Sequence, residues 1–356
     1  MSRFKNTKLR VESLESRQMM AGDVTAYMSG GNLYLTEAAG QTGQENSVVI
    51  SQLPGGQIHV EGNAQITNPN VSSLINGQAY QNFTVPGGLF VNFGAGNDRV
   101  IFTDDTTAAP HFTNVSINVA APEPLVIGRN VTATNTSLKT TPDADQVFIF
   151  SGVTTGNMTI TTGRDHDWIS MGQDVPWSEL NIGGTLSVNS GAGADTVNML
   201  TTQEHGAGKI DIQTYTKLNE ADADNVWLSN AVSNSDLNVR TGAGDDSIHL
   251  NNCTAFHDLN LNAGAGNDTM DLIQDLAVDK LMADLGDGND TLNIDTLYFA
   301  NAANVILGGG NGSDSLNWKN IDPTKYSQFN KTSWERINGR LILNLYAAPI
   351  TAVMAQ

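Results

Sequence analysis

The sequence predicts an all-β protein with a parallel β-helix or β-roll-like solenoid fold and about 22 or more residues in each coil. Three observations support this fold class: a recurring Gly-x-Gly-x-Asp motif, alternating apolar and polar residues on both sides of it, and a composition suited to strands and turns. The 356 residues are 39% hydrophobic and include 35 Gly, and only 15% are charged. This composition is neither disordered nor helical.

The repeat is defined by its aspartates. The full motifs contain Asp98, Asp195, Asp246, Asp268, Asp290 and Asp314, and degenerate motifs contain Asp145, Asp167 and Asp224. From Asp145 onward the successive spacings are 22, 28, 29, 22, 22, 22 and 24 residues. The 47 residues between Asp98 and Asp145 fit two coils, with Pro122 and Pro124 in the intermediate turn. Asn46 fits a still earlier copy. Near-constant steps favour coils that pair with their neighbours over an array of hairpins.

Each coil follows one pattern, a strand before the turn and a second strand after it, as in "LNLNAGAGNDTMDL" at 259–272. Stacked coils bury one row of apolar residues from each strand, and the predicted inward residues are Val239, Ile248, Leu261, Met270 and Leu292. The turns are expected to form one column at a spacing of about 4.8 Å. The turn glycines permit positive φ and close approach of neighbouring coils. The remaining connection of each coil, such as "NNCTAFHD", varies in length and is predicted to be a loop.

The chain divides into four predicted parts. Residues 1–23 form a basic targeting or disordered tail, and residues 24–97 form a strand-rich N-terminal cap with the first coils. Residues 98–317 form the solenoid with its Gly-x-Gly-x-Asp turns. Residues 318–356 are expected to cover the last coil, because an open solenoid end exposes unpaired strand edges.

Charge and cysteine content exclude several classes of protein. The net charge is -19, and a field of this sign repels nucleic acid, so DNA and RNA are not expected partners. No apolar run reaches the 18 residues of a membrane span. Cys253 is the only cysteine, which excludes an intrachain disulfide, and we expect it to be structural.

The N-terminal stretch "LESRQMMAGD" at 14–23 resembles a short motif on predicted extracellular proteins of planctomycete bacteria. That motif reads approximately L-E-x-R-x-[LM]-[LM]-A-G-D, and Met-Met stands here where Leu-Leu is commoner. The resemblance implies export to the cell surface or the extracellular space. The stretch lacks the apolar core of a secretory signal peptide.

The turns resemble the nonapeptide G-G-x-G-x-D-x-U-x of RTX calcium-binding repeats, and "GGNGSDSLN" at 309–317 matches it in full. In that family, turn carbonyls and the Asp carboxylate hold calcium between successive coils. The resemblance therefore implies calcium as the cofactor, held by Asp246, Asp268, Asp290 and Asp314, with Asp245 and Asp287 adding charge to the same column. The family uses two such motifs in each 18-residue coil, whereas one motif occurs here in 22 or more residues. Asp and Gly are also the ordinary residues of tight turns, so a purely structural turn is the alternative interpretation.

Catalytic and sugar-binding candidates are few. Asp165 and Asp167 flank His166 and, in a strand, would share a face as an acid/base pair. Trp168, Trp177 and Trp227 would suit a sugar-binding face, although large aromatics in a solenoid more often pack in the core. We therefore expect an exported, non-enzymatic solenoid that binds calcium and acts as an adhesive or structural component of the cell surface or matrix, with polysaccharide or cell-surface molecules as partners. The alternative is a parallel β-helix polysaccharide lyase or hydrolase.

Overall fold

The computed structural model describes residues 22–41, 43–64, 69, 71–103, 110–120, 125–127, 131–140, 144–149, 153–172, 180–201, 207–215, 221–300, 304–321, 327–334 and 336–340. The fold is all-β, a parallel β-solenoid of about 9 turns with ~23 residues per turn, which confirms the predicted fold class. Among the described residues, no helix has the length and apolar character that a membrane crossing requires.

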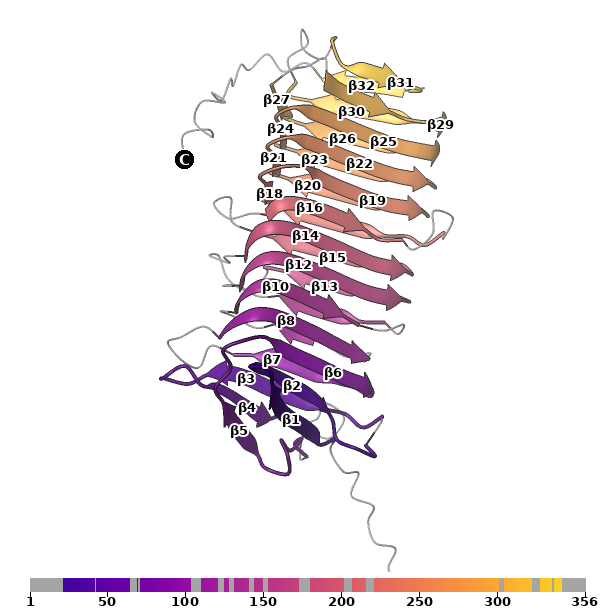
Figure 1. The fold of residues 1–356 in the computed structure, drawn as a ribbon. Helices are drawn as coiled ribbons and strands as arrows, with labels where there is room; N and C mark the ends of the chain where they lie inside the picture. Colours follow the sequence, from indigo (N-terminus) through magenta and orange to yellow (C-terminus); the bar gives the residue numbers. More distant parts are fainter. Residues whose placement is uncertain are drawn as a thin grey trace, which may run out of the picture.

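Among the described residues, two sheets of 18 and 14 strands run along the solenoid (Figure 1). Sheet A has 18 strands: β1 (Val24–Ser29), β2 (Asn32–Glu37), β6 (Leu89–Ala95), β8 (His111–Ala120), β10 (Thr132–Lys139), β12 (Val153–Arg164), β14 (Leu180–Ala192), β16 (Ala207–Gln213), β18 (Val232–Ser233), β19 (Leu237–Ala243), β21 (Thr254–Ala255), β22 (Asp258–Ala265), β24 (Leu276–Ala277), β25 (Lys280–Gly288), β27 (Tyr298–Phe299), β28 (Val305–Gly308), β29 (Asn311–Gly312) and β31 (Asn330–Thr332).

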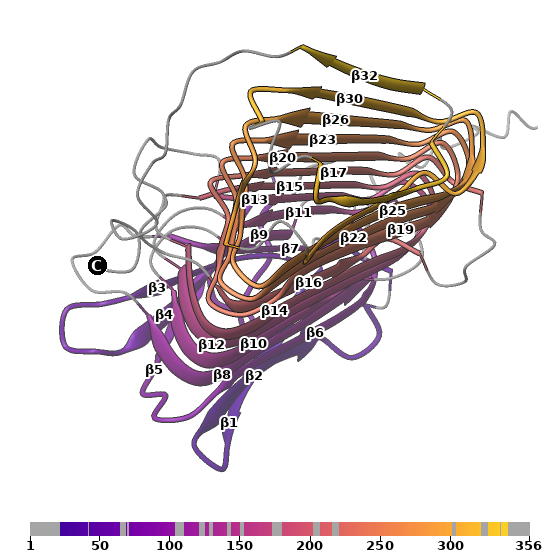
Figure 2. The same ribbon diagram turned by 90° about the horizontal axis from the view of Figure 1, so that it is seen from above.

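Sheet B has 14 strands and faces sheet A across the core, as the view along the stack in Figure 2 shows. Its strands are β3 (Ser47–Gln52), β4 (Ile58–Gly62), β5 (Tyr80–Phe83), β7 (Arg99–Phe102), β9 (Leu125–Ile127), β11 (Gln146–Ile149), β13 (Trp168–Met171), β15 (Thr196–Leu200), β17 (Asn225–Ser229), β20 (Ser247–Asn251), β23 (Thr269–Ile273), β26 (Thr291–Asp295), β30 (Ser315–Lys319) and β32 (Arg336–Arg340).

Each coil runs from a strand of sheet A through the Gly-x-Gly-x-Asp turn into a strand of sheet B, and then through a second corner to the next coil. Neighbouring coils pair in parallel and in register: Leu261 of β22 lies opposite Val239 of β19, and Met270 of β23 lies opposite Ile248 of β20. β9 pairs with β7 and β11, so a further coil does lie between Asp98 and Asp145. The turn predicted there at Pro122 and Pro124 falls outside the described residues.

The core lies between the two sheets and consists of rows of apolar side chains. The five residues predicted to point inward, Val239, Ile248, Leu261, Met270 and Leu292, are all fully buried. Burial of each such side chain contributes on the order of 1.5–3 kcal/mol. Because a row continues from coil to coil, each coil completes the core of its two neighbours.

Antiparallel strands form the N-terminal end of the molecule. β1 pairs antiparallel with β2, and β4 pairs antiparallel with both β3 and β5. The parallel pairs β2–β6 and β3–β7 then join these strands to the solenoid. At the other end, β30 and β32 pair in parallel, so solenoid-type pairing extends beyond residue 317. The alternating segment "LILNLY" lies outside the described residues.

The second corner differs from the predicted loop. It contains the short strands β18, β21, β24 and β27, which stack in parallel. Directly after β17, β20, β23, β26 and β30 lies one non-glycine residue in the left-handed region, with φ between 55° and 61°: Asn230, Asn252, Gln274, Thr296 and Asn320. Asn tolerates this conformation because its short side chain hydrogen-bonds locally, and Asn252 Nδ2 donates to Asn230 Oδ1 at 2.7 Å. The corner is therefore a regular structural element whose signal, a periodic Asn, is incomplete in the sequence.

Thr296 is the least favourable residue at this corner, because a β-branched side chain is strained at positive φ. We expect Thr296→Asn to raise the free energy of unfolding by about 1 kcal/mol. The reciprocal change, Asn252→Thr, is expected to lower it by a similar amount or more, since it also removes the bond to Asn230. Denaturant titration of both variants checks this pair, and equal shifts of the same sign would contradict it.

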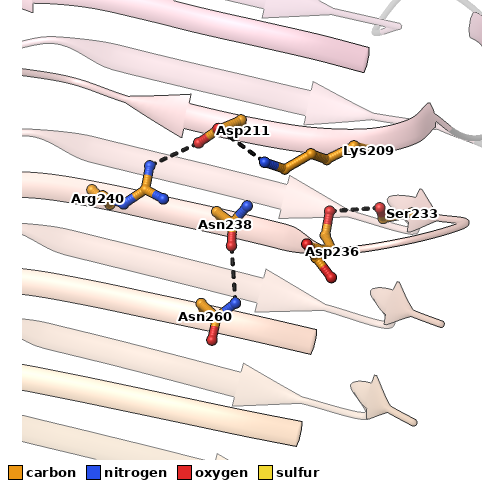
Figure 3. A network of polar contacts seen from close by, with 7 residues as sticks. All are labelled: Lys209, Asp211, Ser233, Asp236, Asn238, Arg240 and Asn260. Atoms are coloured by element: carbon orange, nitrogen blue, oxygen red, sulfur yellow. Dashed lines mark hydrogen bonds and ion pairs between the residues drawn. The ribbon is translucent and has the colours of Figure 1, made fainter. Parts of the chain in front are cut away.

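Polar contacts between coils hold the outer face of sheet A (Figure 3). Arg240 Nη1 lies 2.8 Å from Asp211 Oδ1 across the β16–β19 pair, and Lys209 Nζ lies 3.4 Å from Asp211 Oδ2. One pair further along, Asn260 Nδ2 donates to Asn238 Oδ1 at 3.0 Å. The ion pairs of Asp211 are half-exposed and Asn238 is buried, and all three contacts add register specificity to the backbone pairing.

Candidate functional site: the acidic turn column

The glycines of the Gly-x-Gly-x-Asp turn allow neighbouring coils to touch. Gly264 and Gly266 have φ of 109° and 145°, and a Cβ on either would overlap the carbonyl oxygen of Gly242 or Gly244 in the preceding coil. Gly286, Gly288, Gly310 and Gly312 repeat this contact against a glycine carbonyl of the coil before them. The turns therefore stack in a straight column with backbone against backbone, as the repeat predicts.

The motif aspartates point inward from this column and form a ladder along the solenoid. The Asp246 amide donates to Asp268 Oδ1 at 2.8 Å, and the Asp268 amide donates to Asp290 Oδ1 at 2.8 Å. The Asp290 amide donates to Asp314 Oδ1 at 3.0 Å. Each carboxylate thus fixes the backbone of the preceding coil, which is a local reason for aspartate at this position.

Degenerate motifs belong to the same ladder. The amides of Asp145, Asp167, Asp195 and Asp224 each donate to the Oδ1 of the aspartate in the next coil, at 2.8–2.9 Å. At the N-terminal end, Asn46 donates to Asp98 Oδ1 through both its backbone amide, at 2.8 Å, and its side-chain Nδ2, at 2.9 Å. In the sequence, full and degenerate motifs differ in their glycines. In the structure, the aspartates of both kinds form the same hydrogen-bonded ladder. Asn46 is a copy, as the sequence indicates.

Burial changes the acid chemistry of this ladder. Asp98, Asp195, Asp246, Asp268 and Asp290 are at most 2% exposed. Desolvation raises the pKa of Asp98, Asp195 and Asp268 to about 7, and that of Asp290 to about 6. Desolvation likewise raises the pKa of Asp246. Charge repulsion from neighbouring carboxylates adds to the effect, while the amide hydrogen bonds oppose it.

The second carboxylate oxygen has a hydrogen-bond partner at some positions of the ladder and none among the described residues at others, which include Asp98, Asp195 and Asp246. Asp167 Oδ2 accepts from the Gly163 amide at 3.1 Å, and Asp224 Oδ2 accepts from the Thr214 hydroxyl. By contrast, Oδ2 of Asp268 and of Asp290 is buried and has no hydrogen-bond partner among the described residues. An unsatisfied buried acceptor of this kind costs on the order of 1–3 kcal/mol, so a proton or a cation there is stabilising.

A second ladder runs along the outside of the turns, formed by the residue before each aspartate. The Asn267 amide donates to Asp245 Oδ1 at 2.7 Å, and the Asn289 amide donates to Asn267 Oδ1 at 3.0 Å. The Ser313 amide then donates to Asn289 Oδ1 at 3.0 Å. In this outer ladder a side chain accepts from the following coil, whereas in the inner ladder it accepts from the preceding coil.

The six predicted calcium ligands occupy two positions in the turns. Asp246, Asp268, Asp290 and Asp314 lie in the buried inner column, and Asp245 and Asp287 lie outside it. The two groups are electrostatically linked, since the charge of Asp245 raises the pKa of Asp246, Asp268 and Asp290. Within the described ranges, no group of three or more His, Cys, Asp or Glu side chains is close enough to hold a metal ion.

Comparison with known proteins relates only the N-terminus to a family. Residues 8–24 match the family described as Planctomycete extracellular. The match is short, and it indicates an extracellular-type protein. Searches among curated proteins and among solved structures found no match to this chain.

The last residues of the extracellular motif are part of the fold. The Gly22 amide donates to the Glu45 carbonyl at 3.0 Å, and the Asp23 amide donates to Gln41 Oε1. A Cβ at position 22 would collide with the Asn46 side chain, which caps the inner ladder. The end of the motif therefore packs against the N-terminal end of the acidic column.

The acid/base pair considered for Asp165 and Asp167 is not formed. Asp165 has φ of 66° and is exposed, whereas Asp167 is buried in the inner ladder, so the two carboxylates do not share a face. Left-handed backbone at Asp165 breaks the strand alternation on which that prediction depended. The further candidate Trp177 lies outside the described residues.

Two tryptophans lie on the surface, contrary to the expectation that large aromatics pack in the core. Trp168 is 46% exposed and Trp227 is 51% exposed, both on the outer face of sheet B.

Cys253 is buried, and burial raises the pKa of its thiol, as suits a structural cysteine.

Proposed function

We propose that the protein is an exported structural β-solenoid whose acidic turn column binds calcium, and that it acts as an adhesive or structural component of the cell surface or matrix. The observation that carries this proposal is the column of buried carboxylates with unpartnered oxygens at Asp268 and Asp290. The match of residues 8–24 supports an extracellular setting, where calcium is available.

Calcium suits the donors of this column. It is a hard cation that takes 6–8 oxygen ligands, and carboxylates are its preferred charged ligands. The candidate ligands are Asp245, Asp246, Asp268, Asp287, Asp290 and Asp314. Since the described side chains form no group of three, most of a calcium shell would have to come from backbone carbonyls and water. When bound, the ion would offset the repulsion between stacked carboxylates.

A structural role for the column follows from its hydrogen bonds. The Oδ1 atoms of Asp98 and of the ladder aspartates from Asp167 to Asp314 each accept from a backbone amide of the preceding coil, as at Asp246 and Asp268. Groups held in this way are poorly placed to exchange protons with a substrate. We therefore assign these turns a role in stability and metal binding. Polysaccharide or other cell-surface molecules would bind to the faces of the solenoid instead.

Calcium titration tests the proposal. We expect the full chain to bind calcium with measurable heat and to melt roughly 5–10 °C higher at saturating calcium than in chelator, because a ligand of the native state stabilises it. The double variant Asp268→Asn/Asp290→Asn keeps the Oδ1 acceptors but removes two charges, so it should lose most of both effects.

Asp279→Asn is the matched control, since it removes one exposed carboxylate away from the turns. This variant should bind and melt as the parent chain does. Absence of heat and of a melting shift in the parent chain would overturn calcium binding. Equal losses in the control and the double variant would indicate diffuse attraction to the acidic protein instead.

A further inference from the structure

The outer face of sheet B carries a cluster of side chains that the acidic column does not involve. Ser247 and His249 lie two residues apart on β20, so their side chains share one face of the strand. Asp271 of β23 lies directly opposite His249 in the parallel register. Three residue types that are typical of nucleophilic catalysis therefore meet on two adjacent coils.

The distances in this cluster match those of a nucleophile, a base and an orienting acid. Ser247 Oγ lies 3.1 Å from His249 Nε2, and His249 Nδ1 lies 2.7 Å from Asp271 Oδ2. With Nδ1 protonated and donating to Asp271, Nε2 accepts the hydrogen of the Ser247 hydroxyl. This is the order of contacts by which serine hydrolases activate a hydroxyl.

The surrounding residues hold the cluster in place. Asn293 Nδ2 donates to Asp271 Oδ1 at 2.7 Å, so both carboxylate oxygens are engaged. The indole of Trp227 packs on the imidazole of His249, with ring centroids 5.0 Å apart. The Ser247 amide donates to the Asp224 carbonyl at 2.8 Å, which ties its backbone to the inner ladder. The hydrogen bond from His249 also lowers the pKa of Asp271, which keeps that group ionised.

Two hydrogen-bond donors flank Ser247 on the neighbouring strands. Asn225 of β17 and Thr269 of β23 are its register partners, at about one strand spacing of 4.8 Å on either side. Asn225 Oδ1 is a buried acceptor without a hydrogen-bond partner within the described part of the chain, so the donor that this amide can offer is its Nδ2. Side-chain amides and hydroxyls of this kind stabilise the oxyanion in acyl transfer.

We propose that Ser247, His249 and Asp271 form a second functional site that hydrolyses carboxylic esters, with Asn225 and Thr269 as oxyanion donors. The site goes beyond the proposed calcium-binding role and does not depend on it. It also departs from the sequence-based expectation of a non-enzymatic protein. Its sequence signal is Ser-x-His in a strand with Asp one coil later, which becomes visible only when the 22-residue register is known.

The reaction needs only the ester and water. Ser247 Oγ forms a bond to the acyl carbon while its proton moves to His249 Nε2. The carbon–oxygen bond to the alcohol then breaks, and His249 returns the proton to the departing alcohol oxygen. Water attacks the acyl-serine with His249 as base, which releases the carboxylic acid and restores the Ser247 hydroxyl.

The surroundings of Ser247 and His249 also determine which esters can react. The half-exposed face of Trp227 lies beside His249 and offers an apolar surface for a flat acyl or alcohol group. The net charge of -19 disfavours negatively charged esters near the surface. Neutral esters should therefore react faster than anionic ones of the same size.

A fluorophosphonate probe and 4-nitrophenyl acetate test this site in the full chain. We expect the probe to label Ser247, located by peptide mass spectrometry, and Ser247→Ala and His249→Ala to hydrolyse the ester at least about 100-fold more slowly. Asp271→Asn should slow hydrolysis and shift the pH dependence of kcat/KM, because it alters the base rather than the nucleophile.

Ser315→Ala is the matched control, since Ser315 occupies the same strand position in β30 but is followed two residues later by Asn317 instead of a histidine. It should retain full labelling and activity, and thermal melting of each variant verifies that it is folded. Absence of labelling at Ser247 overturns the proposal. Hydrolysis that persists in Ser247→Ala but is lost in His249→Ala marks a lone surface imidazole and also overturns it.

Discussion

Gly264→Ala is expected to lower the free energy of unfolding by more than about 4 kcal/mol, an exceptional effect for a single methyl group. Two costs combine at this position. Gly264 has φ of 109°, which L-residues rarely adopt, and the added Cβ would overlap the carbonyl oxygen of Gly242. The coils cannot separate to relieve the overlap, because β19 and β22 are paired on one side of the turn and β20 and β23 on the other.

Thermal melting checks this expectation, with a fall of roughly 10 °C or more, or loss of soluble protein. Gly183→Ala is the control, since a Cβ there meets only the Thr155 carbonyl at 3.9 Å and φ is not in the left-handed region. That variant should melt within a few degrees of the parent chain. A Gly264→Ala protein that melts like the control would contradict the close stacking of the turns.

Stability in chelator is expected to fall as the pH rises from 5 to 8. The carboxyls of Asp98, Asp195 and Asp268 have an ordinary pKa of 3.8 that the fold raises to about 7. Between these values the folded protein binds more protons than the unfolded chain, so stability is complete below the lower pKa and is lost as the pH passes the upper one. Because several groups titrate together, the melting temperature should drop by roughly 10 °C or more.

Melting at pH 5, 6, 7 and 8 in chelator measures this slope. Asp268→Asn/Asp290→Asn should flatten it, since two of the titrating carboxyls are gone. Added calcium should also flatten it, because a bound cation favours the ionised form. The pKa of Asp271 is lowered, so its contribution to stability is lost only below this pH range. Asp271 therefore does not change the expected fall of stability between pH 5 and 8. A melting temperature that rises with pH over the range would show that the ladder is not protonated in the folded protein.

The solenoid was predictable because its strongest signal is periodic and local. Alternation around each Gly-x-Gly-x-Asp motif located both main strands, and a spacing of 22 residues indicated parallel stacking, as the β22–β25 register shows. The second corner was missed because its left-handed residue is Asn in only three of five coils, with Gln274 and Thr296 in the others. Because several residue types adopt this left-handed conformation, the corner leaves only a weak pattern in the sequence.

The acidic site was predictable in position but not in orientation. The motif placed Asp246, Asp268 and Asp290 in one column, yet nothing in their spacing shows that the carboxylates point inward to the neighbouring coil. That direction depends on the turn backbone. The contact between His249 and Asp271 depends in turn on register between coils, so the residues of both clusters are neighbours only once the stacking is known.

The inner ladder has a consequence for how such a protein changes in length during evolution. In the ladder, Asp246, Asp268 and Asp290 are each bonded to the coil before and the coil after, and these three copies are 22 residues apart. Duplication of one 22-residue unit in this region therefore recreates both hydrogen bonds and both glycine contacts at the new junctions. Gain or loss of whole units would therefore change the length of the solenoid, while every retained coil keeps the same neighbouring contacts.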